Sequence, residues 1–198
     1  MRLGLMGGTF DPLHYGHLVI AEMARAELGL ERVVWLPAGD PPHKDRRCIS
    51  PQEHRYAMTL LATAEHPAFE VSRLEMEREG PSYTLLTVEH FRREYPEAEL
   101  YFIVGADSIL EILTWHRHAE LVRACRFAAA TRPGYDLAQM RTVLPPDYLE
   151  RIDPIVTPGV DVSSTELRER LRTGRSVRYL VPEPVEAYVR KHQLYTVD

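Results

Sequence analysis

The chain has 198 residues, of which 44% are hydrophobic and 27% charged, and its formal net charge is −5 at pH 7. This length fits one domain with a substantial core. We expect a single unit over residues 1–198, whose C-terminal helical part, from about residue 163, packs on the rest. The acidic balance argues against a general affinity for nucleic-acid backbones, which calls for a basic surface.

Two further features concern where the protein works. Cys48 and Cys125 lie far apart and form no C-x-x-C motif, which is typical of a reducing compartment. The first residues lack the pattern of a secretion signal, and no apolar stretch is long enough to span a bilayer. We therefore expect a cytoplasmic protein without a membrane or nucleic-acid partner. The sequence leaves its oligomeric state open.

Apolar runs and amphipathic segments alternate along the chain. Buried strands are predicted over residues 3–6, 33–36, 69–72, 100–104, 127–131 and 152–156. Helices are predicted over residues 18–28, 51–65 and 84–95, after Gly105, over residues 163–173 and up to about residue 192. This alternation predicts an α/β fold, a Rossmann-like doubly wound and mainly parallel sheet with helices on both faces. Ligands then bind at the carboxyl ends of the strands.

The turn between the first strand and the first helix contains Gly7 and Gly8. Glycines let the backbone adopt positive φ and approach a ligand closely, and the amides of a first helical turn attract anions. His14 and His17 flank Gly16, and their spacing places both imidazoles on one side of that turn. Imidazoles there can donate hydrogen bonds to phosphate and stabilise the charge of nucleotidyl transfer. Zinc binding by the pair is disfavoured because no third ligand follows at a suitable interval.

A second concentration of phosphate chemistry begins at Ser163. Ser163 and Glu166 form a capping-box pattern, so helix structure explains part of this segment. Ser163 is followed by two more hydroxyl residues, Ser164 and Thr165, and then by Arg168. Hydroxyls, exposed amides and a guanidinium at one helix start suit a polyphosphate.

Other candidate residues follow predicted strands or begin predicted helices. They are Lys44, Tyr83, Thr84, Asp107, Trp115 and Arg132. From the residues alone, the ordinary explanation of each is structural: a solvated basic loop, a helix cap, a core tryptophan or a surface turn. For the helix that begins near residue 51, Ser50 and Glu53 predict a capping box with no chemical role.

The motifs resemble those of one enzyme family. The run G-G-T-F-D-P-L-H-Y-G-H matches the signature G-G-[ST]-F-D-P-x-H-x-G-H of the H-x-G-H nucleotidyltransferases, and it resembles more narrowly the bacterial nicotinate-nucleotide adenylyltransferases. P-P-H-K, P-S-Y-T, G-A-D-S, T-W and R-P-G stand where these enzymes have matching patterns. V-S-S-T-E-L-R resembles their I-S-[AS]-T-x-[IL]-R, with Val162 replacing isoleucine. The resemblance spans almost the whole chain.

The resemblance implies transfer of the adenylyl group of ATP to nicotinate mononucleotide, with Mg²⁺ accompanying ATP. It implies that His14, His17 and Arg168 are catalytic. It implies contacts with ATP and its phosphates from Gly7, Gly8, Thr9, Phe10, Gly16, Ser163, Ser164 and Thr165. It implies contacts with nicotinate mononucleotide from Lys44, Tyr83, Thr84, Asp107, Trp115 and Arg132. No protein ligand is assigned to the metal, because Mg²⁺ is often held by phosphates and water.

Three alternatives remain open at this point. The acceptor can be nicotinamide mononucleotide, or phosphopantetheine, which P-P-H-K, P-S-Y-T and T-W disfavour. The third is a non-catalytic nucleotide sensor on the same fold. A sensor is expected to have lost a motif histidine or Arg168, and all three are present.

Overall fold

The computed structural model describes residues 1–42, 49–131 and 137–196, and of residues 137–139 only the backbone. In this part of the chain, six strands form one parallel sheet in the order β3-β2-β1-β4-β5-β6. The strands are β1 (Arg2–Gly8), β2 (Arg32–Pro37), β3 (Phe69–Val71), β4 (Glu99–Gly105), β5 (Arg126–Thr131) and β6 (Ile152–Val156). The predicted doubly wound α/β fold is therefore confirmed.

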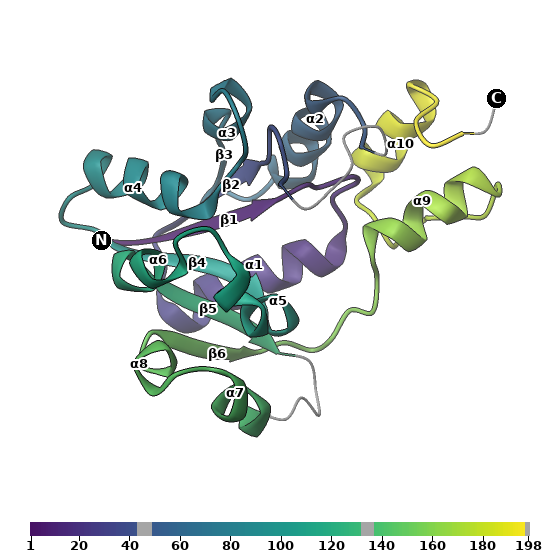
Figure 1. Cartoon of the computed structure of the whole chain (residues 1–198). Helices are drawn as coiled ribbons and strands as arrows, with labels where there is room; N and C mark the ends of the chain where they lie inside the picture. The colour runs from purple at the N-terminus through teal and green to yellow at the C-terminus, as the bar shows by residue number, and fades with distance from the viewer. Residues whose placement is uncertain (43–48, 132–136, 197–198) are drawn as a thin grey trace.

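Helices cover both faces of this sheet (Figure 1). The longer ones are α1 (Tyr15–Leu28), α2 (Gln52–Thr63), α4 (Thr84–Glu94), α9 (Ser164–Arg172) and α10 (Glu183–Lys191). The shorter ones are α3 (Leu74–Glu77), α5 (Ala106–Leu110), α6 (His118–Ala124), α7 (Leu137–Val143) and α8 (Pro146–Leu149), with a 3₁₀ turn over Ile112–Thr114.

Each central strand contributes to two separate cores. Leu3, Leu5 and Phe102 pack in the cluster that includes residues of α4, α6 and α8, whereas Met6 and Ile103 pack in the cluster under α1. Successive side chains of a strand point to opposite faces, so both faces are buried. This double burial explains why the strands appear in the sequence as continuous apolar runs rather than as alternating patterns.

The order of the strands reverses at β1. Chain connections lead from β1 outward to β2 and β3 on one side, and from β4 outward to β5 and β6 on the other. In doubly wound sheets a crevice opens beyond the carboxyl ends of the strands at such a point. The turn after β1 and the turn after β4 therefore border the same crevice.

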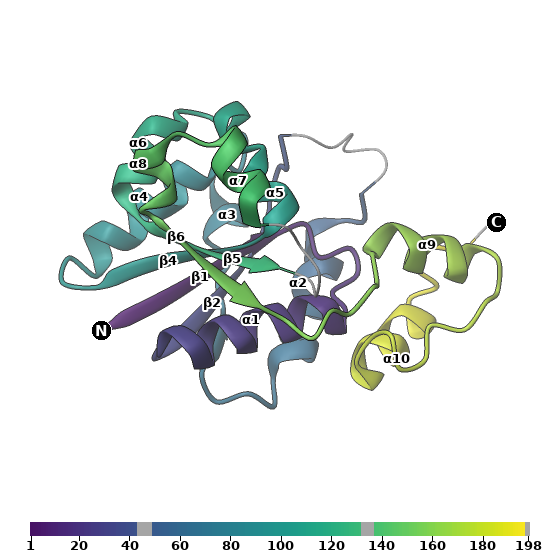
Figure 2. The same cartoon turned by 90° about the horizontal axis from the view of Figure 1, so that it is seen from below.

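The last two helices pack beyond those carboxyl ends (Figure 2). Leu167 of α9 and Val185 and Val189 of α10 form an apolar cluster with Met58 of α2. The end of the chain is thereby attached to the side of the sheet where ligands are expected.

Local starts of helices differ from the prediction in two places. Helix α1 begins three residues earlier than predicted, so that His17 lies inside its first turn and His14 is its N-cap. The capping box at Ser50 is wrong: Pro51 is the N-cap of α2, and no side chain caps this helix within the described residues. The Ser50 backbone is committed elsewhere, since its N–H donates to the Asp11 carboxylate and its carbonyl accepts from Arg55.

Candidate active site

The loop after β1 is shaped by Phe10 rather than by its two glycines. We expected positive φ at Gly7 and Gly8, which is wrong because both belong to β1, and the residue with positive φ (49°) is Phe10. The glycines instead leave room for aromatic rings. A Cβ on Gly7 would lie 3.1 Å from the Phe102 ring, and one on Gly8 would lie 2.7 Å from the Phe10 ring.

His14 and His17 form a stacked pair at the start of α1. Their ring centroids are 3.7 Å apart with an interplanar angle of 28°. The backbone N–H of His14 donates to Nδ1 of His17 at 3.3 Å, the bond that a glutamate supplies in an ordinary capping box. Because Nδ1 accepts, the ring proton of a neutral His17 lies on Nε2. That nitrogen is then the hydrogen-bond donor of this ring.

Burial keeps His14 neutral. The side chain is almost fully removed from solvent, and this desolvation lowers its pKa from 6.5 to about 4. Gly16 contributes to this burial, since a Cβ there would lie 3.0 Å from the His14 ring and 3.5 Å from the carbonyl of Val160. The first turn of α1 therefore fits closely beneath the segment that leads to α9.

The structure brings the second phosphate motif onto the first. Arg168 Nη1 donates to the carbonyl of Asp11 at 2.8 Å, and the hydroxyl of Ser164 donates to the carbonyl of Pro12 at 3.0 Å. Ser163 caps α9 by accepting the N–H of Glu166, as predicted. The N-terminus of α9 is thus fixed against the loop that carries the histidines. A helix N-terminus in this position attracts anions.

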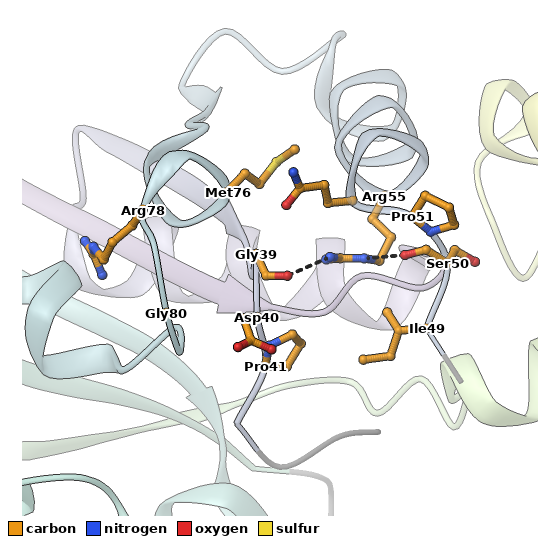
Figure 3. A pocket seen from close by; sticks show the side chains of 11 residues that line it. Gly39, Asp40, Pro41, Ile49, Ser50, Pro51, Arg55, Met76, Arg78 and Gly80 are labelled. Atoms are coloured by element: carbon orange, nitrogen blue, oxygen red, sulfur yellow. Dashed lines mark hydrogen bonds between the residues drawn. The ribbon is translucent and has the colours of Figure 1, made fainter. Parts of the chain in front are cut away.

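Arg55 of α2 also holds this loop, and Figure 3 shows its guanidinium between Gly39 and Ser50. Its guanidinium donates to the carbonyls of Ser50 and Thr9, at 3.0 Å each, and to that of Gly39 at 3.5 Å. The side chain is 2% exposed, and burial lowers its pKa while the nearby Asp11 carboxylate acts in the opposite direction. A cavity of about 340 Å³ adjoins this arginine between Gly39 and α2.

Two cavities meet at His17. One, of about 240 Å³, lies between α1 and the segment before α9, and His14, Asp107 and Val160 line it. The other, of about 370 Å³, lies over the ends of β1 and β4, and Thr9, Thr84 and Trp115 are among its lining residues. His17, Ile20 and Gly105 border both. Two ligands can therefore bind side by side with an imidazole at their junction.

The second cavity has an aromatic outer wall. The Trp115 ring is half-buried and meets Phe102 edge to face, with centroids 6.1 Å apart. Tyr83 stacks on His116 at 4.1 Å, and both line an adjoining cavity of about 220 Å³ that Trp115 and Thr84 share. A flat heterocycle suits such a wall. Asp107, which was expected on this side, lines the cavity on the opposite side of His17.

Two residues without a predicted role, Glu75 and Ser82, help to form the second cavity. Glu75 lines the larger cavity, and its buried carboxylate accepts a hydrogen bond from Thr87 at 2.7 Å. Burial raises the pKa of Glu75. The hydroxyl of Ser82 accepts the N–H groups of Gly39 and Asp40, at 3.0 and 3.2 Å. No short motif marks Glu75, because its segment appears in the sequence as a polar connection.

Three residues discussed from the sequence lie outside the described residues. They are Lys44, Cys48 and Arg132. Among the residues that are described, no three or more His, Cys, Asp or Glu side chains are grouped so that they could hold a metal ion. In the same parts of the chain, no helix has both the length and the apolar character needed to cross a membrane.

A parallel sheet with its switch point at β1, and a helix start carrying H-x-G-H at that point, define a nucleotide-binding α/β protein of the nucleotidyltransferase kind. Residues 5–170 match the family model described as cytidylyltransferase-like, and the chain belongs to this family.

Curated relatives align over almost the whole chain. One from Moorella thermoacetica, named "Probable nicotinate-nucleotide adenylyltransferase", is 54% identical, with 98% of this chain and 91% of the relative covered. A protein of the same name from Thermus thermophilus is 49% identical, with 98% of this chain and 100% of the relative covered.

Solved structures agree on the fold. The nicotinic acid mononucleotide adenylyltransferase of Plasmodium falciparum, complexed with NaAD, superposes with a TM-score of 0.78 at 20% identity, over 98% of this chain and 97% of the other. Its complex with APC gives a TM-score of 0.77 at 19% identity. At such low identity the likeness concerns the fold.

Proposed function

We propose that this chain transfers the adenylyl group of ATP to nicotinate mononucleotide, forming nicotinate adenine dinucleotide and pyrophosphate. The observation that carries the proposal is the hydrogen-bonded contact between the N-terminus of α9 and the loop after β1. It brings Ser163, Ser164, Thr165 and Arg168 to the same edge as His14 and His17. The names of relatives with 49 to 54% identity support the same reaction.

The chemistry needs alignment and charge stabilisation rather than a protein nucleophile. A phosphate oxygen of nicotinate mononucleotide attacks the α-phosphorus of ATP, the new P–O bond forms, and the bond to pyrophosphate breaks. The attacking group is already an anion, so no covalent enzyme intermediate is required. The protein holds both substrates in line and donates hydrogen bonds to oxygens on which charge builds up.

Each motif has a part in this step. His17 lies at the junction of the two cavities, and we assign its Nε2–H as a donor to the α-phosphate. Burial keeps the His14 imidazole neutral, so it acts on the α-phosphate as a polar group and not as a cation. The first turns of α9 bind the departing pyrophosphate, through Ser163, Ser164, Thr165 and Arg168. We retain Gly7, Gly8, Thr9, Phe10 and Gly16 as the segment assigned to ATP and its phosphates, with Gly7, Gly8 and Thr9 on the side of the second cavity.

We assign the two cavities to the two substrates. Adenosine occupies the cavity between α1 and residues 160–162, where Asp107 is placed to meet the ribose. The mononucleotide occupies the cavity over β1 and β4, with its pyridine ring against Trp115 and its carboxylate near the start of α4 at Tyr83 and Thr84. We retain Lys44 and Arg132 as further contacts of the mononucleotide phosphate.

Mg²⁺ belongs to this proposal as part of the substrate. We assign it no protein ligand among the described residues, where no three His, Cys, Asp or Glu side chains are grouped. Mg²⁺ then arrives bound to ATP phosphates and water, its usual arrangement with nucleotides. We place the reaction in the cytoplasm, with ATP and nicotinate mononucleotide as partners and no part for nucleic acid or a membrane.

A pyrophosphate-release assay tests the reaction. The chain is incubated with ATP and Mg²⁺ and, in parallel, with nicotinate mononucleotide, nicotinamide mononucleotide or phosphopantetheine. The highest kcat/KM is expected with nicotinate mononucleotide, together with nicotinate adenine dinucleotide as the chromatographed product. Turnover only with phosphopantetheine, or with none of the three, overturns the proposal.

A further inference from the structure

The loop that carries the catalytic motif is held by side chains from distant segments. Its carbonyls accept hydrogen bonds from Arg55, Ser164 and Arg168. The Asp11 carboxylate is bound separately, by the N–H of Ser50 at 3.1 Å and by the hydroxyl of Tyr195 at 2.6 Å. Asp11 is 1% exposed, so the hydrogen bonds of its carboxylate come from these protein donors rather than from solvent.

Tyr195 reaches Asp11 from the far end of the chain. The two residues are 184 positions apart, and the tyrosine follows α10. Its ring packs on the apolar cluster formed by α2, α9 and α10, where a phenylalanine would fill the same space. An O–H···O⁻ bond of 2.6 Å lies in the short range of charge-assisted bonds. Burial and the adjacent Asp11 raise the pKa of Tyr195, so the phenol keeps its proton as a donor.

We propose that Tyr195 is a positioning residue for adenylyl transfer: its hydroxyl fixes Asp11 and thereby sets the loop from which His14 and His17 reach the α-phosphate. The catalytic part of this inference rests on the proposed function, whereas the hydrogen bond between Tyr195 and Asp11 is independent of it. Asp11 and His14 are close neighbours in the same loop, and rates respond steeply to small displacements of catalytic groups.

The substitution Tyr195→Phe tests this with minimal disturbance, because it removes one hydroxyl and retains the ring. We expect kcat to fall about tenfold while KM for both substrates stays within about twofold, since the substrate contacts remain and only alignment is lost. The matched control is Tyr188→Phe. It removes a hydroxyl of the same C-terminal region that bonds His54 Nδ1 at 3.0 Å rather than the Asp11 carboxylate.

A second readout does not depend on activity. In ¹⁵N-labelled protein without substrates, the imidazole signals of His14 and His17 are expected to shift in Tyr195→Phe and to stay unchanged in Tyr188→Phe. Asp11→Asn should shift the same signals. The double variant Tyr195→Phe/Asp11→Asn should be no slower than the slower single variant, because both changes break one contact.

These measurements separate the inference from the proposed function. If wild-type protein releases no pyrophosphate with any acceptor, the function fails and the imidazole spectra still decide the positioning role. If wild-type protein is active and Tyr195→Phe matches Tyr188→Phe in kcat and in spectra, the positioning role is overturned and the function stands. Additive losses in the double variant also overturn it.

Discussion

The guanidinium of Arg168 donates a 2.8 Å hydrogen bond to the backbone carbonyl of Asp11, 157 positions earlier in the chain. Its other terminal nitrogen reaches the hydroxyl of Thr165 at 3.3 Å. The fork of the guanidinium thus links the loop after β1 to the first turn of α9. Because of this link, the two segments that we propose to bind the triphosphate lie against each other.

Replacing His17 by alanine should lower kcat about 10²- to 10³-fold, because one preorganised donor to the charge of the transition state is lost. Steady-state kinetics of pyrophosphate release measure this. The control is His90→Ala, which removes an exposed histidine paired with Glu94. A His17→Ala enzyme within a few-fold of wild type would remove the imidazole from the mechanism.

Stability should depend on pH through His14. Its pKa is about 4 in the folded protein against 6.5 as the ordinary value, so between these values the unfolded chain binds a proton that the folded one does not. The unfolding free energy therefore decreases as pH falls from 7 to 4, by about 3 kcal/mol from this group. Urea unfolding of wild type and His14→Asn at pH 7 and at pH 4 measures this effect. The unfolding free energy of wild type minus that of His14→Asn should be about 3 kcal/mol smaller at pH 4 than at pH 7. A constant difference, or an imidazole titration midpoint near the ordinary value, contradicts this prediction.

Trp115→Ala should weaken use of the mononucleotide selectively. Loss of a stacking surface worth about 0.5–1.5 kcal/mol beyond its buried area predicts at least a several-fold rise in KM for nicotinate mononucleotide, with KM for ATP unchanged. Trp115→Phe, which retains an aromatic face, should recover part of the loss. Equal effects on both substrates would refute the assignment of this cavity.

Arg55 should matter more for stability than an exposed arginine. Arg55→Met leaves buried carbonyls without their donor, so the unfolding free energy should fall by about 3 kcal/mol or more. Arg73→Met is the matched control. Arg73 pairs with Glu53 at the surface, and its loss should change stability by less than about 1 kcal/mol. Denaturant unfolding of both variants gives the comparison, and equal losses would show that the Arg55 contacts contribute little.

Features encoded locally were predictable. The run from Leu100 to Val104 marks a buried strand, and Ser163 caps α9, because each depends on residues close by in the sequence. The spacing of His14 and His17 also predicted their shared side, since three residues make nearly one helical turn.

Hydrogen bonds between residues far apart in the sequence leave no such local pattern. Arg55 lies in an amphipathic helix, where an arginine is usually a surface group, yet its partner Thr9 is 46 positions away. Ser50 is a residue type typical of helix caps but bonds to Asp11, and Tyr195 is an ordinary residue in the sequence. The order of the strands and these contacts depend on packing between segments, which periodicity does not record.

The central claim is that the triphosphate of ATP lies between the histidines after β1 and the N-terminus of α9. A crystal structure with Mg²⁺ and an ATP analogue that has a methylene bridge between its α- and β-phosphorus atoms tests it most directly. We expect the α-phosphate within hydrogen-bond distance of His17 Nε2 and the β- and γ-phosphates at the first turn of α9, near Ser164 and Arg168. A triphosphate bound with no contact to α9 would contradict it.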